Sequence, residues 1–236
     1  MWWEKFLDFL NAIEPVLLVI IPAMLGIWIK IKAKIEEKEQ KIKTENTAKN
    51  ENIFSSWEHE KSKEVIDNIQ SICNYYKDIG YMDLVNYIQF ENGTTAMSKI
   101  CNMFLTCLAE DNRFGTIPKM IDYVHRTSYS RLSVWVKDIN SAPDGIYIAT
   151  KREDFSEDYS DFIPSCKHIK SFISGAVKDP NGVLIGICSF YYVDTLDSSV
   201  IEQNVAVLRK FITSVETIFL NYQLDREKMK KSLNLA

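Results

Sequence analysis

The chain has 236 residues, of which 46% are hydrophobic and 12% aromatic, and its formal net charge is -4. This length and composition suit one ordinary folded domain with an appendage and exclude a disordered chain. The negative charge argues against a nucleic-acid binder with a wholly basic surface, because neutralising phosphates requires clustered Lys and Arg. The cysteines are five, an odd number without the spacing of a disulfide framework, which favours a reduced, cytoplasmic setting for the folded part.

The amino-terminal region contains an uncharged stretch at residues 15–29, PVLLVIIPAMLGIWI. Extended to residue 31, it has about the minimum length that crosses the hydrocarbon of a bilayer. Acidic residues before it argue against a secretory signal peptide, and a buried core helix is the alternative interpretation. We therefore expect residues 1–31 to form an interfacial helix and a transmembrane anchor. The residues assigned to the anchor are Trp2, Trp3, Pro15, Ile20, Pro22, Trp28, Lys30 and Lys32.

Lysines are distributed unevenly around this stretch. Six lie between residues 30 and 43, whereas Lys5 is the single basic residue before residue 15. The positive-inside rule then predicts that the bulk of the chain lies in the cytoplasm. The expected localisation is the inner (plasma) membrane, crossed once, with the lipid bilayer as a partner.

Residues 32–56 are highly charged and carry a sparse apolar series of Ile35 and Ile42 that continues from Ile31. The series predicts a helical stalk that frays into a polar linker near residues 44–52, with too few heptads to establish a coiled coil. A second helix is expected at residues 57–79, because apolar residues recur on one face and Gly80 is a natural stop. The expected domains are the anchor at 1–31, the stalk at 32–56, an α/β domain at 57–223 and a basic tail at 224–236.

The middle of the chain reads as short strands with loops between them. Strands are expected at residues 83–93, closed by an Asn92-Gly93 turn, and at 102–110 and 145–150. A helix is expected at 116–126, capped by Thr116 with Pro118 in its first turn, and residues 131–139 suit helix or strand. Residues 170–179 and 182–194 predict a hairpin with its turn at Asp179 to Gly182. Its second strand is apolar on both faces and is therefore expected to be central.

The last long helix is predicted to start with a capping box of Ser199 and Glu202. Its apolar residues alternate steps of four and three, a seven-residue repeat. Such a stripe either packs on the sheet or forms a seam shared with a second subunit, and both can hold. The residues assigned to the oligomer seam are Ile201, Val205, Leu208, Ile212, Val215 and Phe219.

From about residue 57 to 222 the order of elements resembles a GAF domain, a relative of the PAS fold. The resemblance rests on FENG after the first strand, on VKDPNGVLIGICSFYY and on the helix from Ser199. It implies an α+β fold, an antiparallel sheet flanked by long N- and C-terminal helices, here preceded by one transmembrane helix and a helical stalk. It also implies a small-ligand site between the sheet and the middle loops, with simple core packing as the alternative for each residue. The ligand-binding candidates carried over by position are Tyr87, Gln89, Asn92, Met103, Leu105, Cys107, Arg131 and Trp135.

The plan of one membrane segment, a stalk and a small α/β domain also resembles the holins of T-even phages and GAF-like membrane proteins of phages. The matching positions are Ser165 and Cys166, residues 172–192, and the helix from Ser199. Those holins place their globular domain outside the cytoplasm, opposite to the orientation that the lysines predict here.

Enzyme motifs are absent from the sequence: it has no phosphate-cradling glycine loop, GxSxG, HExxH or paired CxxC. Cys166 and His168 suggest a thiolate pair, with a packed cysteine beside an exposed histidine as the alternative. An acidic segment suggests a divalent-cation site, although a solvated acidic face is favoured. Its residues are Glu153, Asp154, Glu157, Asp158 and Asp161. We expect no catalytic residue, no metal and no cofactor.

These observations predict a membrane-anchored, non-enzymatic regulatory or sensor protein. Its GAF-like domain is expected to bind a small molecule or a regulatory protein and to form a homo-oligomer, without binding nucleic acid. The alternative is a phage holin-like protein that permeabilises the inner membrane to time host lysis.

Overall fold

The computed structural model describes residues 2–80, 82–95, 101–113, 117, 119–156, 158–159 and 168–235. Internal contacts divide the chain into two compact units. The first is Met1–Ser56 with Lys230–Ala236, and the second is Trp57–Met229. The second unit contains the sheet and is called the sheet domain below.

Within the described residues, six strands form one antiparallel sheet in the order β3-β2-β1-β6-β5-β4. The strands are β1 (Leu84–Thr95), β2 (Cys101–Asn112), β3 (Thr127–Ser128), β4 (Ile146–Ala149), β5 (Ser171–Lys178) and β6 (Leu184–Tyr192). The α-helices are α1 (Trp2–Gly80), α2 (Ser133–Ser141) and α4 (Ser198–Ser232). Single 3-10 turns occur at Met120–Asp122, Tyr129–Arg131, Pro143–Gly145 and Arg152–Asp154.

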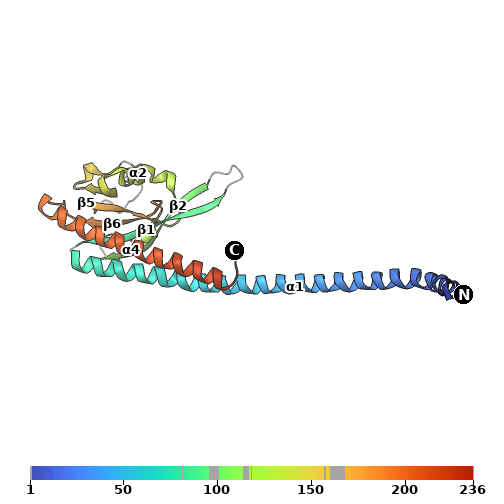
Figure 1. The fold of residues 1–236 in the computed structure, drawn as a ribbon. Coiled ribbons are helices and arrows are strands. Elements are labelled where there is room, and N and C mark those ends of the chain that lie inside the picture. Colours follow the sequence, from blue (N-terminus) through green and yellow to red (C-terminus); the bar gives the residue numbers. More distant parts are fainter. Residues whose placement is uncertain are drawn as a thin grey trace. The chain divides into compact units, whose positions relative to one another are not determined.

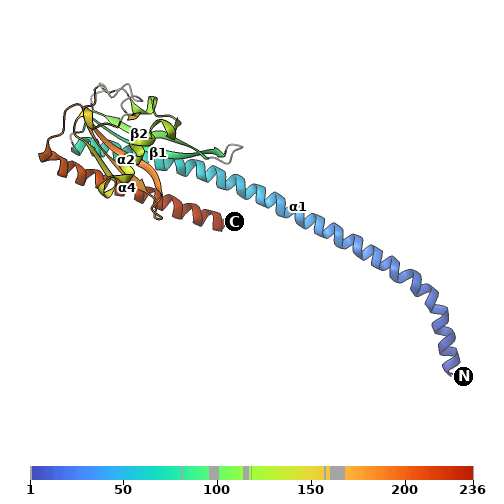
Figure 2. The same cartoon turned by 90° about the horizontal axis from the view of Figure 1, so that it is seen from above.

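Helices cover one face of the sheet, and α2 with the connecting loops covers the other. In the sheet domain, the last turns of α1 and most of α4 lie side by side along one face, called the helix face here (Figures 1 and 2). The opposite face, called the loop face, lies beneath α2. Each face carries its own buried cluster, with Leu84, Ile88 and Phe172 on the loop face and Val85, Ile173 and Phe190 on the helix face.

Strand β6 is buried on both of its faces, as its apolar sequence predicts. Ile187 and Tyr191 belong to the loop-face cluster, whereas Cys188 and Phe190 belong to the helix-face cluster. Alternate residues of a strand point to opposite faces, so a strand covered on both sides is expected to be apolar at most positions on either face. The strand lies between β1 and β5, which confirms that it is central.

The predicted turn before β6 is also confirmed, and hydrogen bonds of the Asp179 side chain explain it. The Asp179 carboxylate accepts hydrogen bonds from the backbone N–H groups of Asn181 (2.9 Å) and Val183 (2.8 Å). Gly182 has φ 80°, a left-handed conformation that glycine adopts without steric cost. Asp179 therefore fixes the loop while Gly182 supplies the angle that closes it.

The repeat along α4 packs against the sheet. Leu208 and Val215 are fully buried, and Val205, Ile212 and Phe219 pack against the same helix-face cluster. Phe211, which lies beside this repeat, stacks on Phe190 with ring centroids 5.8 Å apart. Ile201 is half-buried near the start of the helix. The repeat is thus observed to pack on the sheet of its own chain, and its role in a seam shared with a second subunit stays a prediction.

The predicted membrane anchor and the inner-membrane localisation are wrong. Helix α1 runs without a break through residues 15–31, and no described helix has a stretch long and apolar enough to cross a membrane. The apolar run at 15–29 is about 22 Å long at the helical rise, short of the roughly 30 Å of bilayer hydrocarbon. The holin-like alternative depended on such a segment and is not supported. Trp2, Trp3, Trp28, Lys30 and Lys32 are exposed on α1.

Other local expectations also change. Asn92 and Gly93 lie inside β1 and do not form its turn, and the stalk expected to fray at 44–52 is continuous helix. The helix expected at 116–126 is only a 3-10 turn from Met120, and Thr116 and Pro118 lie outside the described residues. Helix α4 begins one residue earlier than its predicted cap, because the Asp197 carboxylate accepts the Ser199 backbone N–H at 2.9 Å. These hydrogen bonds lower the pKa of Asp197.

Gly186 tests the close packing of β1 on β6. A Cβ at this position would lie 2.5 Å from the Tyr87 ring and 2.7 Å from the Ile88 carbonyl oxygen, which is backbone and cannot rotate away. We expect Gly186→Ala to lower the free energy of unfolding by about 1–3 kcal/mol. Urea unfolding followed by circular dichroism measures it. Gly182→Asn is the control, since its Cβ meets nothing within 4 Å and asparagine tolerates positive φ; equal losses for the two variants would refute the packing argument.

Candidate functional site

A row of polar residues crosses the otherwise apolar loop face. Through the strand register, Glu110 on β2 pairs with Asn86 on β1, Asn86 pairs with Ser189 on β6, and Ser189 pairs with Ser174 on β5. The flanking residues Leu84 and Ile88, two positions from Asn86 on either side, belong to the loop-face cluster. Residues two apart on a strand share a face, so the row lies beneath the loops and α2. These four residues are called the polar row.

The two serines of the polar row satisfy one another, and Asn86 does not find a partner. The Ser174 and Ser189 hydroxyl oxygens are 2.8 Å apart and buried. Asn86 is fully buried, and neither its Nδ2 nor its Oδ1 has a hydrogen-bond partner within the described part of the chain. Burying a polar group without a partner costs about 1–3 kcal/mol. The amide is therefore an unused donor and acceptor, side by side, in the middle of the sheet.

Glu110 ends the polar row on β2 and is partly satisfied. Its Oε2 accepts the backbone N–H of Ile121 at 3.1 Å, whereas the buried Oε1 has no partner among the described atoms. Desolvation raises the pKa of Glu110, and the backbone hydrogen bonds from Ile121 and Met120 only partly oppose that effect. The carboxyl group thus resists ionisation more than an exposed glutamate does.

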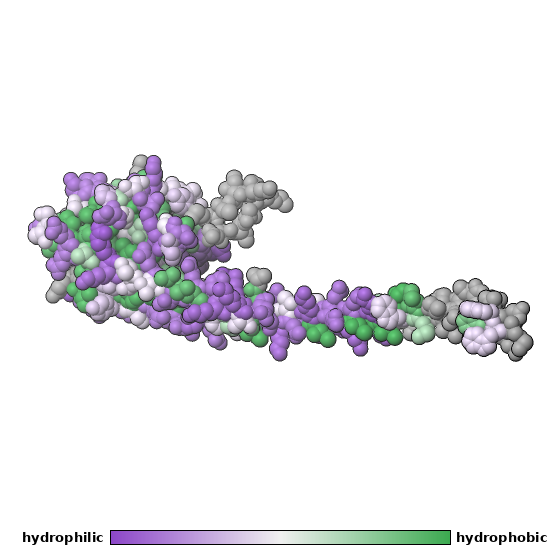
Figure 3. Space-filling view, in the orientation of Figure 1, coloured by the Kyte–Doolittle hydropathy of each residue, from purple (hydrophilic) through white to green (hydrophobic). Residues whose placement is uncertain are grey.

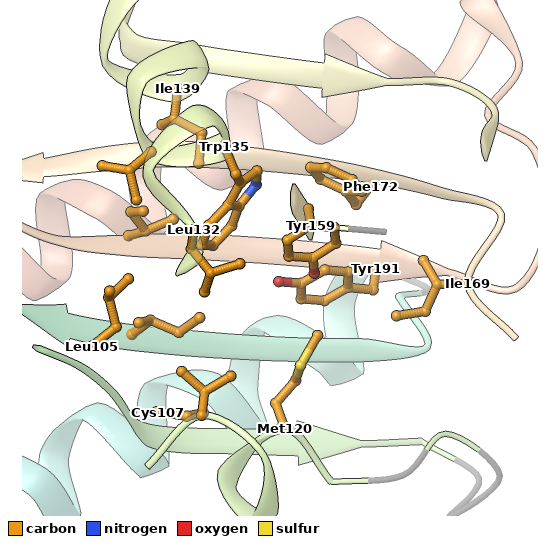
Figure 4. Packing of buried hydrophobic residues seen from close by; sticks show 14 of the residues in the cluster. Leu105, Cys107, Met120, Leu132, Trp135, Ile139, Tyr159, Ile169, Phe172 and Tyr191 are labelled. Atoms are coloured by element: carbon orange, nitrogen blue, oxygen red, sulfur yellow. The ribbon is translucent and has the colours of Figure 1, made fainter. Parts of the chain in front are cut away.

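Aromatic rings gather over the same face. The Trp135 and Tyr159 centroids are 4.8 Å apart, and Tyr159 and Phe172 are 5.1 Å apart. Figure 4 shows that these three rings and Tyr191 lie together, and that Met120 and Cys107 lie in the lower part of the cluster. Trp135 is fully buried, and its Nε1 has no hydrogen-bond partner among the described residues. A buried tryptophan normally places that N–H on an acceptor, so this donor is a second unused group.

Asp158 holds α2, and hence Trp135, in place. Its carboxylate accepts the backbone N–H groups of Val134 at 2.7 Å and of Trp135 at 3.2 Å, which are otherwise unsatisfied at a helix start. Asp154 acts in the same way on its own turn, because its carboxylate accepts from the Thr150 hydroxyl at 2.8 Å and from backbone N–H groups. These bonds lower the pKa of Asp154. Asp154 and Asp158 of the acidic segment are therefore used for capping.

The structure gives no support to a cation site. No group of three or more metal-ligating side chains occurs in the part of the chain that the structure describes. Glu157 and Asp161, which belonged to the suggested acidic cluster, lie outside the described residues, as does Cys166. The thiols of Cys73, Cys107 and Cys188 are buried, and desolvation raises the pKa of each, which leaves them poor nucleophiles.

The six ligand-binding candidates whose side chains are described do not converge on one place. Leu105, Cys107 and Trp135 belong to the loop-face cluster. Tyr87 lies on the helix face, where its ring is 5.7 Å from that of Phe219. The remaining candidates are distributed over the rest of the sheet: Gln89 is half-buried and pairs with Gly186, Asn92 pairs with Met103 with side chains outside the description, and Arg131 lines a cleft at the sheet edge.

The polar row itself was missed by reading the sequence, although a signal for it is present. Asn86 interrupts the apolar positions of LVNYI, and Ser174 and Ser189 do the same in FISGA and ICSFYY. A polar residue at the inward phase of a buried strand is unusual enough to mark a functional position. Pairing the three across strands requires the register, which only the structure provides.

No family model matches the chain. No curated protein matches it either. Solved structures of GAF domains do share its fold. A phycocyanobilin-bound GAF domain from a cyanobacterial phytochrome is 9% identical, with 75% of this chain and 96% of that chain covered and a TM-score of 0.52. A phycoerythrobilin-bound GAF domain from a cyanobacterial phytochrome is 8% identical, with 76% of this chain and 97% of that chain covered and a TM-score of 0.51.

The blue-light absorbing form of the Thermosynechococcus elongatus PixJ GAF domain is a further similar structure. It is 13% identical, with 71% of this chain and 94% of that chain covered and a TM-score of 0.50. At such identities the likeness concerns the fold alone. The chain therefore has a GAF-like α+β fold, and that prediction is confirmed.

Replacing the orphaned amide should stabilise the protein. Because Asn86 buries a donor and an acceptor that nothing satisfies, we expect Asn86→Leu to raise the free energy of unfolding of the ligand-free protein by about 1–3 kcal/mol. Urea unfolding measures the change. Ser189→Ala is the matched comparison, since it leaves Ser174 without its partner and should destabilise by about 1 kcal/mol. A loss of stability in Asn86→Leu would mean that the amide is satisfied.

Glu110 should make stability depend on pH. Its pKa in the folded state is raised above the ordinary 4.5, so the unfolded chain ionises first and folded-state stability falls as the pH rises through the folded pKa. Glu110→Gln removes this titration. We expect the variant to gain stability relative to wild type at pH 7 and to lose that gain at pH 4, measured by urea unfolding at both values. A difference independent of pH would contradict the assignment.

Proposed function

We propose that the sheet domain is a non-enzymatic sensory domain that binds a small organic ligand on its loop face. The observation that carries the proposal is the Asn86 amide, fully buried and unpaired at the centre of the sheet. Native proteins rarely leave a buried polar group unused, and an exception points to a missing partner. A ligand that supplies the partner binds this state and stabilises it. The buried, high-pKa thiols favour binding over covalent chemistry.

The chemistry of the ligand follows from the unpaired polar groups of Asn86 and Trp135. An asparagine amide presents one acceptor and two donors in a plane, and it pairs best with a group that carries a donor beside an acceptor, such as a lactam, a primary amide or the edge of a nucleobase. The Trp135 N–H adds a further donor, and the surrounding rings favour a planar, largely apolar molecule. The bilin-bound GAF domains support this proposal, as structures of the same fold that hold an organic ligand.

The same strand offers a route from ligand to helices. Asn86 lies between Val85 and Tyr87, which belong to the helix-face cluster. Tyr87 contacts Phe219 of α4, and the α1 residue Tyr76 contacts Phe211 of α4 at 5.2 Å. A ligand that moves β1 at Asn86 therefore acts on the contacts that hold α4 and the end of α1. This would make the two long helices the output of the domain.

Self-association forms the second part of the proposal. On α1, within the first unit, Ile31, Ile35 and Ile42 are exposed by 53%, 51% and 58% at spacings of four and seven residues. Figure 3 shows apolar side chains interleaved with polar ones along this helix. These three isoleucines, called the α1 seam here, are covered when a second copy of the chain aligns with them in parallel. Lys34 of one copy then faces Glu39 of the other across the edge of the α1 seam. We propose that the chain forms a homodimer through this seam.

Ligand binding is tested by comparing the wild-type protein with Asn86→Leu. Native mass spectrometry of the full chain should detect a bound small molecule, or a panel of nucleobases and lactams should raise the wild-type melting temperature. We expect the bound mass and the shift to disappear in Asn86→Leu and to remain in Thr213→Ala, an exposed change on α4. Equal binding by wild type and Asn86→Leu would refute the loop-face site.

The dimer is tested by Ile35→Lys, which brings two charges together in the seam. We expect light scattering to give the mass of a dimer for the wild type and of a monomer for Ile35→Lys at micromolar concentration. Ala33→Lys adds the same charge at an exposed position away from the seam and should stay dimeric. A monomeric wild type, or dissociation in both variants, would contradict the seam.

A further inference from the structure

The middle of α1 contains a stretch that is poorly suited to a helix. Residues 44–52, called the weak stretch here, read TENTAKNEN and consist mostly of Thr and Asn, which have low helix propensity, and of charged residues. The hydroxyl groups of Thr44 and Thr47 donate to the backbone carbonyl oxygens of Gln40 and Lys43, each at 2.9 Å. Such bonds to the carbonyl four residues earlier weaken and bend helices. The weak stretch is nevertheless helical without a break, so contacts from outside it are expected to hold it.

The end of α4 supplies such contacts within the first unit. The Asn50 amide Nδ2 donates to the backbone carbonyl oxygen of Leu233 at 3.0 Å. The Lys230 ammonium lies 6.0 Å from the centroid of the Phe54 ring, at the outer limit of a cation–π contact. Both contacts bring residues 230–235, called the C-terminal latch here, to this part of α1.

Apolar side chains of the C-terminal latch face the two ends of the weak stretch. Leu233 and Leu235 line the same cleft as Ile42 and Ile53, which precede and follow the weak stretch. The cleft keeps a volume of about 700 Å³, and Ile42 and Ile53 stay exposed by 58% and 40%. The latch thus covers α1 only in part, as expected of a contact that opens and closes.

The C-terminal latch has a defined shape because a Schellman motif ends α4. The Leu235 backbone N–H donates to the Lys230 carbonyl oxygen at 3.0 Å. The Asn234 N–H donates to the Lys231 carbonyl oxygen at 3.2 Å. Asn234 has φ 52°, the left-handed conformation that asparagine tolerates better than most residues with a side chain. This one residue therefore sets the direction in which the latch leaves α4.

We propose that the C-terminal latch is a conformational device that keeps the weak stretch helical. While the latch is docked, α1 is one continuous helix. When the latch leaves, the weak stretch loses its supporting contacts and becomes a flexible linker. A helix transmits a displacement along its axis and a flexible linker does not, so the latch controls whether the parts of α1 before and after the weak stretch move together. This device depends neither on the proposed ligand nor on the α1 seam.

Hydrogen exchange of the full chain, followed by mass spectrometry, tests the latch. We expect the weak stretch to exchange about tenfold faster in Asn234→Val than in the wild type, because a β-branched residue adopts positive φ only at a high cost and opens the turn. Asn234→Gly is the matched control, since glycine adopts this conformation freely and should exchange as the wild type does. Leu235→Ser removes an apolar side chain from the cleft and should also accelerate exchange of the weak stretch.

Three results would overturn the proposal. They are unchanged exchange of the weak stretch in both Asn234→Val and Leu235→Ser, equal acceleration in Asn234→Gly, or acceleration that extends equally to β1, which would indicate a general loss of stability.

Ile35→Lys separates the latch from the proposed dimer. We expect Ile35→Lys to leave the weak stretch protected, and Asn234→Val to accelerate its exchange in that background as well. If a second copy of the chain protected the weak stretch in place of the latch, Ile35→Lys alone would give the fast exchange and Asn234→Val would add nothing. The latch and the α1 seam therefore succeed or fail independently in this experiment.

Discussion

The burial of β1 and β6 on both faces is the constraint on which the rest of the domain depends. Two helices cover one side of these strands, and α2 with the loops covers the other. A polar side chain in this position has no access to water, so every donor and acceptor must be met by protein or by ligand. Ser174 and Ser189 meet one another across the strands. Asn86 meets nothing among the described residues, and this difference turns an ordinary core position into a candidate site.

Stability and function are opposed at the polar row. An apolar residue at position 86 would pack into the cluster around Leu84 and Ile88 without a desolvation cost. Proteins keep such costly groups where activity depends on them, and they offset the cost elsewhere in the fold. Here the offsets are visible in the stacked Phe190 and Phe211 rings and in the Asp158 carboxylate that caps α2. Glu110 adds a second group whose ionisation is penalised by burial.

Much of the fold could be predicted because its signals are local. The apolar run of β6, the turn at Asp179 and the stop at Gly80 each depend on residues that are neighbours in sequence, and all three are found. The failures depend on distant context. Asn92 and Gly93 carry strong turn chemistry, yet pairing with β2 extends the strand through them. An apolar stretch of marginal length was read as a membrane span, although it continues directly into the charged remainder of α1.

The site was harder to predict than the fold, for a physical reason. Side chains of a strand alternate between the two faces of the sheet, but the sequence alone does not say which set faces which side. A shift of one residue exchanges the faces on which Asn86 and Tyr87 lie. Reading by family position selected Tyr87, and the register gives the loop face to Asn86 instead. Arg131 was selected for the same ligand site, and it lines the separate cleft at the β3 edge.

The most direct measurement of the central claim is the electron density around the Asn86 amide in a high-resolution crystal structure of the protein as purified. The account predicts density for a small molecule within hydrogen-bond distance of both Nδ2 and Oδ1, beside the Trp135 ring. A close-packed interior in which the amide is satisfied by protein groups would contradict the account, because the loop face would then have no unmet partner for a ligand to supply.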